Sequence, residues 1–154
     1  MNPVFSMTAA EQQHFFMTRV PHNEALGMRV THCSPGKLSV DMPYSAELVG
    51  NPATGEMHEG TLTALLDATS GSVVLTQLDD LRRTATLDLR LDFLRRAKAG
   101  ADIHCDAWCL TITDHVATVR AIAHDGDSAD PVAVATGSFA VFPPSVKPAA
   151  GAAV

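Results

Sequence analysis

The sequence predicts an α+β fold in which an antiparallel β-sheet wraps around one long central helix. Residues 59–77 predict the helix, because they contain no proline and repeat apolar residues at helical spacing. Strand-like segments lie on both sides of it, two before the helix and four after it, separated by short turns. Strands joined by short turns pair antiparallel, and a helix with one apolar face buries that face against the sheet.

Composition indicates a single globular domain. The chain has 154 residues, of which 46% are hydrophobic and 18% charged, and its formal net charge is −6. This acidic balance argues against nucleic-acid binding, which needs a basic face. No apolar run reaches the roughly 18 residues of a membrane span, so we expect no membrane partner. Without a secretory leader pattern, and with three unevenly spaced cysteines (Cys33, Cys105 and Cys109), we expect a cytoplasmic protein with reduced thiols.

The N-terminal residues are expected to cover the main domain. Thr8 and Glu11 form a capping-box pattern that predicts a helix over about residues 9–18, and Pro21 is expected to end it. The expected organisation is an N-terminal helical lid, the main domain and a flexible tail rich in Pro, Ala and Gly, over residues 1–24, 25–142 and 143–154.

Two strands are predicted before the long helix, over about residues 27–33 and 37–42, with a Ser-Pro-Gly turn between them. In the second strand, Leu38, Val40 and Met42 alternate with polar residues, as expected for a sheet with one solvated face. Residues 43–57 are expected to form a loop that leads into the helix.

The long helix has two different faces. The apolar face, expected to be buried, consists of Leu62, Leu65, Leu66, Thr69 and Val73. Small residues and one carboxylate form the opposite side, which consists of Gly60, Ala64, Asp67, Ala68 and Gly71. Because glycine inside a helix costs about 1 kcal/mol relative to alanine, this side predicts a close approach by another backbone or by a ligand.

Four strands are predicted after the helix. The first shows the clearest alternation, and its apolar face is expected to contain Ala85, Leu87, Leu89, Leu91 and Phe93. The opposite face is expected to contain Thr86, Asp88, Arg90 and Asp92. The other three strands are expected over residues 101–113, 115–124 and 131–142.

Asp67 and the helix start are the two main candidates for chemistry. A carboxylate between leucines can be partly desolvated and act as a base, although Asp67 also lies away from the leucine stripe and solvent exposure is the alternative. At the helix start, the N–H groups near His58, Glu59 and Gly60 form a cradle for an oxyanion, although every helix has such an end.

Helix geometry indicates how these candidates combine. Glu59 and Asp67 are eight residues apart, about 12 Å along the helix axis, which is too far for both to act on one carbonyl group. A shared reaction centre therefore requires two copies of the chain, with their central helices antiparallel across a two-fold axis.

Other polar clusters allow weaker predictions. Arg95, Arg96 and Lys98 are candidates for binding substrate phosphates, and a solvated turn is an equally good interpretation. Metal-binding patterns are poor, because neither the His104, Cys105 and Cys109 group nor the Asp125–Asp130 loop has the required ligands and spacing. No metal or redox cofactor is predicted.

Over about residues 27–142 the chain resembles the hotdog-fold acyl-CoA thioesterases of the phenylacetic-acid-pathway (PaaI-like) type. Asn51 and Gly55 followed by His58-Glu59-Gly60 are similar to the family's Asn…Gly-x-x-His-Gly-Gly. The family's catalytic acid follows seven residues after the last glycine, and Asp67 stands there. The remaining similarities are the stretches Thr86–Leu89, Phe93–Ala97 with Gly100, and Ala135–Phe139.

The resemblance implies roles for these residues. Asp67 would be the nucleophile or general base, the Glu59 N–H would polarise the thioester carbonyl, and Thr86 would position the attacking water. Asn51 would assist at the carbonyl, beside the helix start formed by His58, Glu59 and Gly60. Glu59 replaces a family glycine, and its carboxylate either adds bulk and charge or acts as a second acid or base. The family also implies a homodimer, often paired into a dimer of dimers, with the site between subunits.

The predicted function is hydrolysis of an acyl-CoA thioester to a free acid and CoA, with CoA as part of the substrate and no separate cofactor. One alternative is a non-catalytic acyl-CoA-binding protein of the same fold, to which the unusual Glu59 gives some weight. A hotdog hydratase or dehydratase is the other, but the Asp-x-Asn-x-x-His pattern of those enzymes is absent.

Overall fold

The computed structural model describes residues 1–144, so most of the expected C-terminal tail lies outside the described residues. In chain order, the elements are η1 (Pro3–Ser6), α1 (Ala9–Gln13), the π-helical turn η2 (His14–Thr18), α2 (Pro21–Ala25), β1 (Arg29–Ser34), β2 (Lys37–Met42), η3 (Ala46–Leu48), β3 (Val49–Asn51), β4 (Glu56–Met57), α3 (Glu59–Leu75), β5 (Thr84–Phe93), β6 (Ile103–Ile112), β7 (Val116–His124) and β8 (Ala133–Val141).

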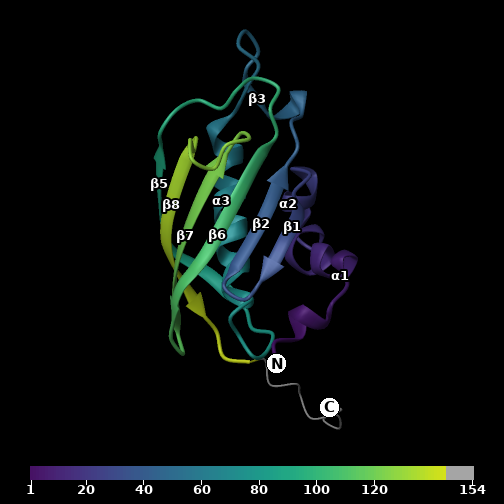
Figure 1. The fold of residues 1–154 in the computed structure, drawn as a ribbon, viewed down its shortest axis with the longest axis vertical. Coiled ribbons are helices and arrows are strands. Elements are labelled where there is room, and N and C mark those ends of the chain that lie inside the picture. The colour runs from purple at the N-terminus through teal and green to yellow at the C-terminus, as the bar shows by residue number, and fades with distance from the viewer. Residues whose placement is uncertain (145–154) are drawn as a thin grey trace, which may run out of the picture.

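A six-stranded antiparallel sheet packs around α3, as predicted (Figure 1). Its strand order is β1-β2-β6-β7-β8-β5. Helix α3 has 17 residues and packs against β2, β5, β6, β7 and β8, whereas α1 and η2 pack against the edge strand β1. Among the described helices, none has the length and apolarity needed to cross a bilayer.

The core lies between α3 and the inner face of the sheet. All five residues of the expected apolar face of α3 are buried, with at most 3% of each exposed. From the sheet side, Leu38, Val40 and Met42 of β2 are fully buried, and the alternation predicted for this strand is confirmed. Burial of each such side chain stabilises the fold by about 1.5–3 kcal/mol.

The N-terminal segment packs on the core through side-chain anchors. The capping box of Thr8 and Glu11 is present, although α1 ends at Gln13 and continues as the π-helical turn. The Asn2 side chain donates to the Leu75 carbonyl oxygen at the end of α3 (2.7 Å). The helical segment ends at Thr18, before Pro21, as predicted. Pro21 is also the first residue of α2, a helix that was not predicted; there its missing N–H costs nothing and its fixed φ favours the helix.

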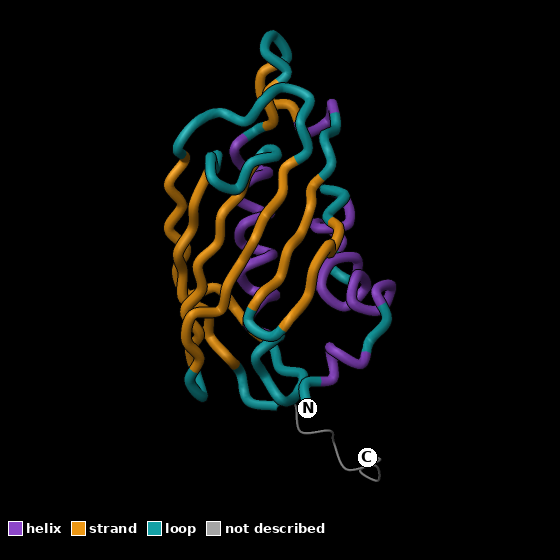
Figure 2. Tube along the Cα trace, viewed as in Figure 1, coloured by secondary structure: helices purple, strands orange, loops and turns teal. Residues whose placement is uncertain are grey.

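The segment expected to be a loop before α3 contains more structure than predicted. It includes η3 and a two-stranded hairpin, β3–β4, at the end of the molecule where α3 begins (Figure 2). This hairpin places Asn51 and Glu56 next to the helix start.

Strand β5 differs from the simple alternation that its sequence predicts. Its pairing with β8 shifts between Thr86 and Asp88, so Leu87 is an extra residue in the ladder. Such a β-bulge reverses the side-chain alternation. Thr86 therefore faces α3 together with Leu89, and the prediction that Leu87 and Leu89 share one face was wrong; Leu87 is 58% exposed.

Candidate active site

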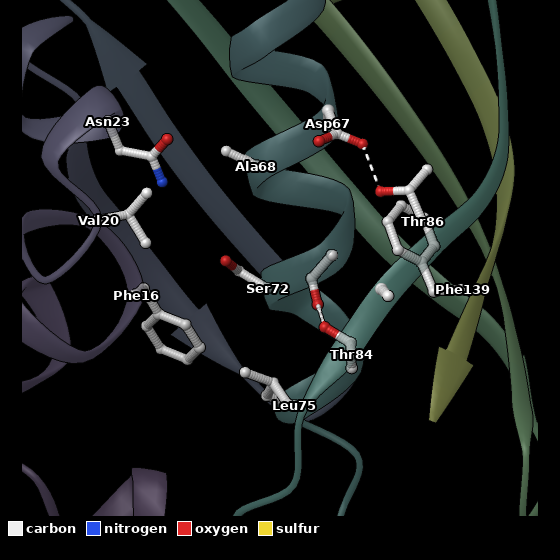
Figure 3. A pocket seen from close by; sticks show the side chains of 12 residues that line it. Phe16, Val20, Asn23, Asp67, Ala68, Ser72, Leu75, Thr84, Thr86 and Phe139 are labelled. Atoms are coloured by element: carbon white, nitrogen blue, oxygen red, sulfur yellow. Dashed lines mark hydrogen bonds between the residues drawn. The ribbon is translucent and has the colours of Figure 1, made fainter. Parts of the chain in front are cut away.

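The small-residue side of α3 forms the floor of a groove. Residues of α2 and the preceding turn form one wall, and β5 forms the other (Figure 3). A cavity of about 200 Å³ runs from Asp67 toward Leu75, and one of about 570 Å³ runs from Asp67 toward Gly60. The predicted close approach is therefore explained in part within one chain, because a Cβ on Gly71 would lie 3.3 Å from the Phe139 ring.

Asp67 and Thr86 are brought together in this groove. The Thr86 hydroxyl donates a hydrogen bond to Oδ1 of Asp67 over 2.8 Å (Figure 3). Asp67 is half-buried, and its Oδ2 has no hydrogen-bond partner among the described residues. One carboxylate oxygen is thus fixed, and the other is available to a water or a substrate in the groove.

The helix start offers one free backbone donor. Nδ1 of His58 accepts the Gly60 N–H (2.9 Å), so His58 caps α3 with its own side chain. Because Nδ1 is the acceptor, a neutral His58 carries its proton on Nε2. The Glu59 N–H has no partner among the described residues, and the helix dipole favours negative charge at this position.

The remaining helix-start candidates gather around a separate cavity. This cavity has a volume of about 300 Å³, and Asn51, Glu56, His58, Glu59 and Arg96 all line it. Oδ1 of Asn51 accepts the Ala53 N–H, which leaves its amide group free to donate. Asp67 and Thr86 do not line this cavity. A single chain therefore places Asn51, His58 and Glu59 in a different cavity from Asp67 and Thr86, whereas Gly60 lines a cavity together with Asp67.

The three basic candidates differ in their surroundings. Arg95 forms two hydrogen bonds with the Asp125 carboxylate (2.7 and 2.9 Å) and an ion pair with Asp130 (3.1 Å). The hydrogen bonds from Arg95 hold the pKa of the fully buried Asp125 side chain well below its usual range, against the effect of burial. Arg96 and Lys98 are about 70% exposed, and Arg96 pairs with Glu56 (2.8 Å).

Sequence reasoning missed two polar residues of the groove. Asn23 of α2 and Ser72 of α3 both line the cavity next to Asp67, and Figure 3 shows Asn23 directed into the groove. Asn23 is only 8% exposed, although it lines the cavity. Interpreting Pro21 as a helix start would have predicted α2, but not which of its residues face the groove.

The weak metal patterns do not come together in the structure. His104 points to the outer face of the sheet and bonds to Asp41 (2.8 Å), whereas Cys105 is buried on the inner face. Burial raises the pKa of the Cys105 thiol to about 12. Within residues 1–144, no group of three or more His, Cys, Asp or Glu side chains is placed to hold a metal ion.

A long helix wrapped by an antiparallel sheet, with a carboxylate in a groove along it, defines a hotdog-fold protein, as predicted. The family model described as the thioesterase superfamily matches residues 54–132, which is more than half of the chain. The chain therefore belongs to the thioesterase superfamily, and the prediction of a thioester hydrolase is confirmed.

Individual relatives agree with this assignment. The medium/long-chain acyl-CoA thioesterase YigI of Salmonella typhimurium is 27% identical over 139 residues, which cover 82% of this chain and 88% of the relative. A solved structure from Pseudomonas aeruginosa is 31% identical, with a TM-score of 0.79 over 88% of this chain and 100% of the other. The Escherichia coli PaaI protein shares the fold, with 20% identity and a TM-score of 0.74 over 88% of this chain and 94% of the other.

Proposed function

We propose that this protein hydrolyses acyl-CoA thioesters as a homodimer, with Asp67 as the general base or nucleophile. The observation that carries the proposal is the Thr86–Asp67 hydrogen bond of 2.8 Å within an open groove. It fixes one carboxylate oxygen and leaves the other directed to the groove, which is the arrangement that a general base needs. The naming of the YigI relatives as acyl-CoA thioesterases supports CoA as the thiol.

In the proposed reaction, Asp67 acts on the thioester carbonyl carbon in one of two ways. Either its free oxygen takes a proton from a water that attacks the carbonyl carbon, or that oxygen attacks the carbon directly and water then hydrolyses the anhydride. The C–S bond breaks when the tetrahedral adduct collapses, and the CoA thiolate leaves with a proton supplied by Asp67 or by water. In both routes the carbonyl oxygen becomes negative, and the Glu59 N–H at a helix start would stabilise it. Asn51 is proposed to assist at the carbonyl, and Thr86 to orient the water.

A second copy of the chain is needed to assemble this centre. Glu59 and Asp67 lie about 12 Å apart along one helix, so each Asp67 would work with the helix start of the partner. Strand β5 is a ten-residue edge strand that pairs only with β8 among the described strands. Long unpaired edges with exposed apolar side chains favour pairing with another chain. Pairing of two β5 edges across a two-fold axis would set the α3 helices antiparallel.

The CoA part and the acyl part of the substrate are proposed to bind to different residues. Arg96 and Lys98, both largely exposed, are proposed to receive the CoA phosphates, whereas Arg95 is already occupied by Asp125 and Asp130. The acyl group is proposed to lie in the cavity between Asp67 and Leu75, about 12 Å long. The apolar residues that line it are Phe16, Val20, Ala68, Leu75, Ala85 and Phe139.

The decisive experiment measures release of free CoA thiol over a panel of acyl-CoA substrates. We expect Asp67→Asn to lower kcat by about 100-fold or more, because the variant keeps the shape but loses the base. Asp88→Asn, which changes an exposed carboxylate on the outer face of β5, serves as the matched control and should keep wild-type activity. Full activity of Asp67→Asn would contradict the role of Asp67. Tight acyl-CoA binding without turnover by the wild type would instead favour the non-catalytic alternative.

A further inference from the structure

We infer that Gly137 of β8 is a positioning residue for the proposed catalytic pair, because it makes room for the β5 bulge that turns Thr86 toward Asp67. The inference rests on the proposed function only for its effect on activity. Gly137 does not line the groove and has no part in the chemistry.

The bulge decides which way Thr86 points. Leu89, Leu91 and Phe93 pair with Gly137, Ala135 and Ala133, three buried positions on the inner face of β8. Counting back from Leu89 by strict alternation, Leu87 would face α3 and Thr86 would face away from it. The extra residue at Leu87 reverses this order, so Thr86 lies opposite the inward-facing Phe139 and its hydroxyl reaches Asp67.

The segment before the bulge is attached to α3 at two points. Thr84, two residues before Thr86, donates its hydroxyl to the Gly71 carbonyl oxygen (3.3 Å). Thr86 makes the second attachment at Asp67. Both threonines face the helix, so the reversed alternation extends along the strand before the bulge and is not limited to Thr86.

Gly137 is the residue of β8 that the bulged part of β5 approaches most closely. A Cβ on Gly137 would lie 2.6 Å from the Asp88 carbonyl oxygen and 2.8 Å from Cδ1 of Leu89. The first contact is with backbone, so a side chain here cannot be relieved by a rotamer change alone, and β5 has to move. The backbone of Gly137 is not in the left-handed region, so close approach, and not conformational freedom, is the reason for glycine at this position.

Kinetics of Gly137→Ala and Thr86→Val, alone and combined, test this inference. We expect each single variant to lower kcat by about 10- to 100-fold, the usual effect of losing a hydrogen bond to a charged group, with KM nearly unchanged. In the double variant, the Gly137→Ala change should have little further effect, because the Thr86 hydroxyl is already missing. Independent, multiplicative losses would show that Gly137 acts only on general stability and would overturn the inference.

Ser138→Ala is the matched control, since this neighbouring residue points to the opposite face of the same strand. It should leave kcat unchanged. If Gly137→Ala folds poorly, deletion of Leu87 in the same chain provides a second test. Without Leu87 the ladder is regular, the alanine is no longer crowded, and Thr86 still faces α3 opposite Phe139. We therefore expect the double variant to regain both thermal stability and activity. A double variant that is stable but remains inactive would contradict the inference.

A crystal structure of Gly137→Ala separates this inference from the proposed function. We expect the distance from the Thr86 hydroxyl to Asp67 Oδ1 to exceed about 3.5 Å, the limit of a hydrogen bond. A distance that stays at 2.8 Å overturns the inference even if the protein is a thioesterase. If the wild type releases CoA from no substrate, the proposed function fails, and this distance still tests the positioning role of Gly137.

Discussion

The middle and the start of α3 are built in opposite ways. In the middle, a side chain from another strand fixes Asp67, and α2 and β5 wall the groove on both sides. At the start, His58 caps the helix locally, and the backbone N–H of the exposed Glu59 has no partner within residues 1–144. The middle is thus assembled within one chain, whereas the start presents a donor to something outside it. This difference is what favours a site shared between two chains.

At the helix start, the largest expected effect comes from removing the free donor. Glu59→Pro deletes the N–H at the first helical position, where proline is well tolerated. His58 already has the extended backbone (φ −67°, ψ 133°) that a residue before proline prefers. We expect kcat to fall by about 100-fold, as for loss of an oxyanion donor, with little change in Tm. Steady-state kinetics and thermal unfolding measure the two quantities.

Mixing variants then tests whether the two regions come from different chains. Neither Asp67→Asn nor Glu59→Pro should be active alone, but a heterodimer of the two has one site with both groups intact. An equimolar, fully exchanged mixture should therefore recover about a quarter of wild-type activity. No recovery after verified subunit exchange would show that Glu59 and Asp67 do not share a site across the dimer.

A smaller effect is expected from the ion pair that supports the helix-start side. Arg96 lines the helix-start cavity, and the neighbouring Arg95 ties this loop to the buried Asp125 carboxylate. Asp125→Asn should lower the free energy of unfolding by about 2 kcal/mol at pH 7, because charged hydrogen bonds are lost. Urea unfolding measures this, and kcat should change by less than about threefold because the Asp67 groove is untouched.

The pH dependence of this effect has a definite sign. The pKa of Asp125 is lowered on folding from an ordinary value of 3.8, so its contribution is complete above that pH. It is lost as the pH falls through 3.8 toward the lower folded-state value. The difference between wild type and Asp125→Asn should therefore shrink between about pH 4 and pH 2. Asp114→Asn, at an exposed turn, is the control; an equal difference at pH 7 and pH 3 would contradict the assignment.

The sequence predicted the parts of the fold that depend on local periodicity. The apolar face of α3 and the alternation of β2 were predictable because each follows one unbroken period. The bulge at Leu87 was not predictable from the sequence of β5. An extra residue is defined by how the strand pairs with its neighbour, and the alternating pattern of the strand itself does not show it. The available signal was Gly137, a glycine inside the apolar partner strand.

The candidate site was predictable to a different extent. Asp67 was indicated by small residues around it, and these do line the groove. Its partner Thr86 lies 19 residues away, and only the family resemblance connected the two. Asn23 was missed because its contribution depends on how α2 packs over α3, which no local pattern in residues 21–25 specifies.

The smallest expected effect concerns the side chain of Glu59, and it sharpens the distinction between backbone and side chain at the helix start. Glu59→Gly keeps the free N–H and removes a carboxylate next to the proposed oxyanion, so we expect kcat to be unchanged or higher. Glu59→Gln is the matched variant, because it removes the charge and keeps the bulk. If charge alone limits the rate, both variants gain equally; if bulk limits it, only the glycine variant gains. A loss of more than about tenfold in both, or 1.4 kcal/mol of barrier, would make the Glu59 carboxylate itself a catalytic group, because the backbone donor is present in all three proteins.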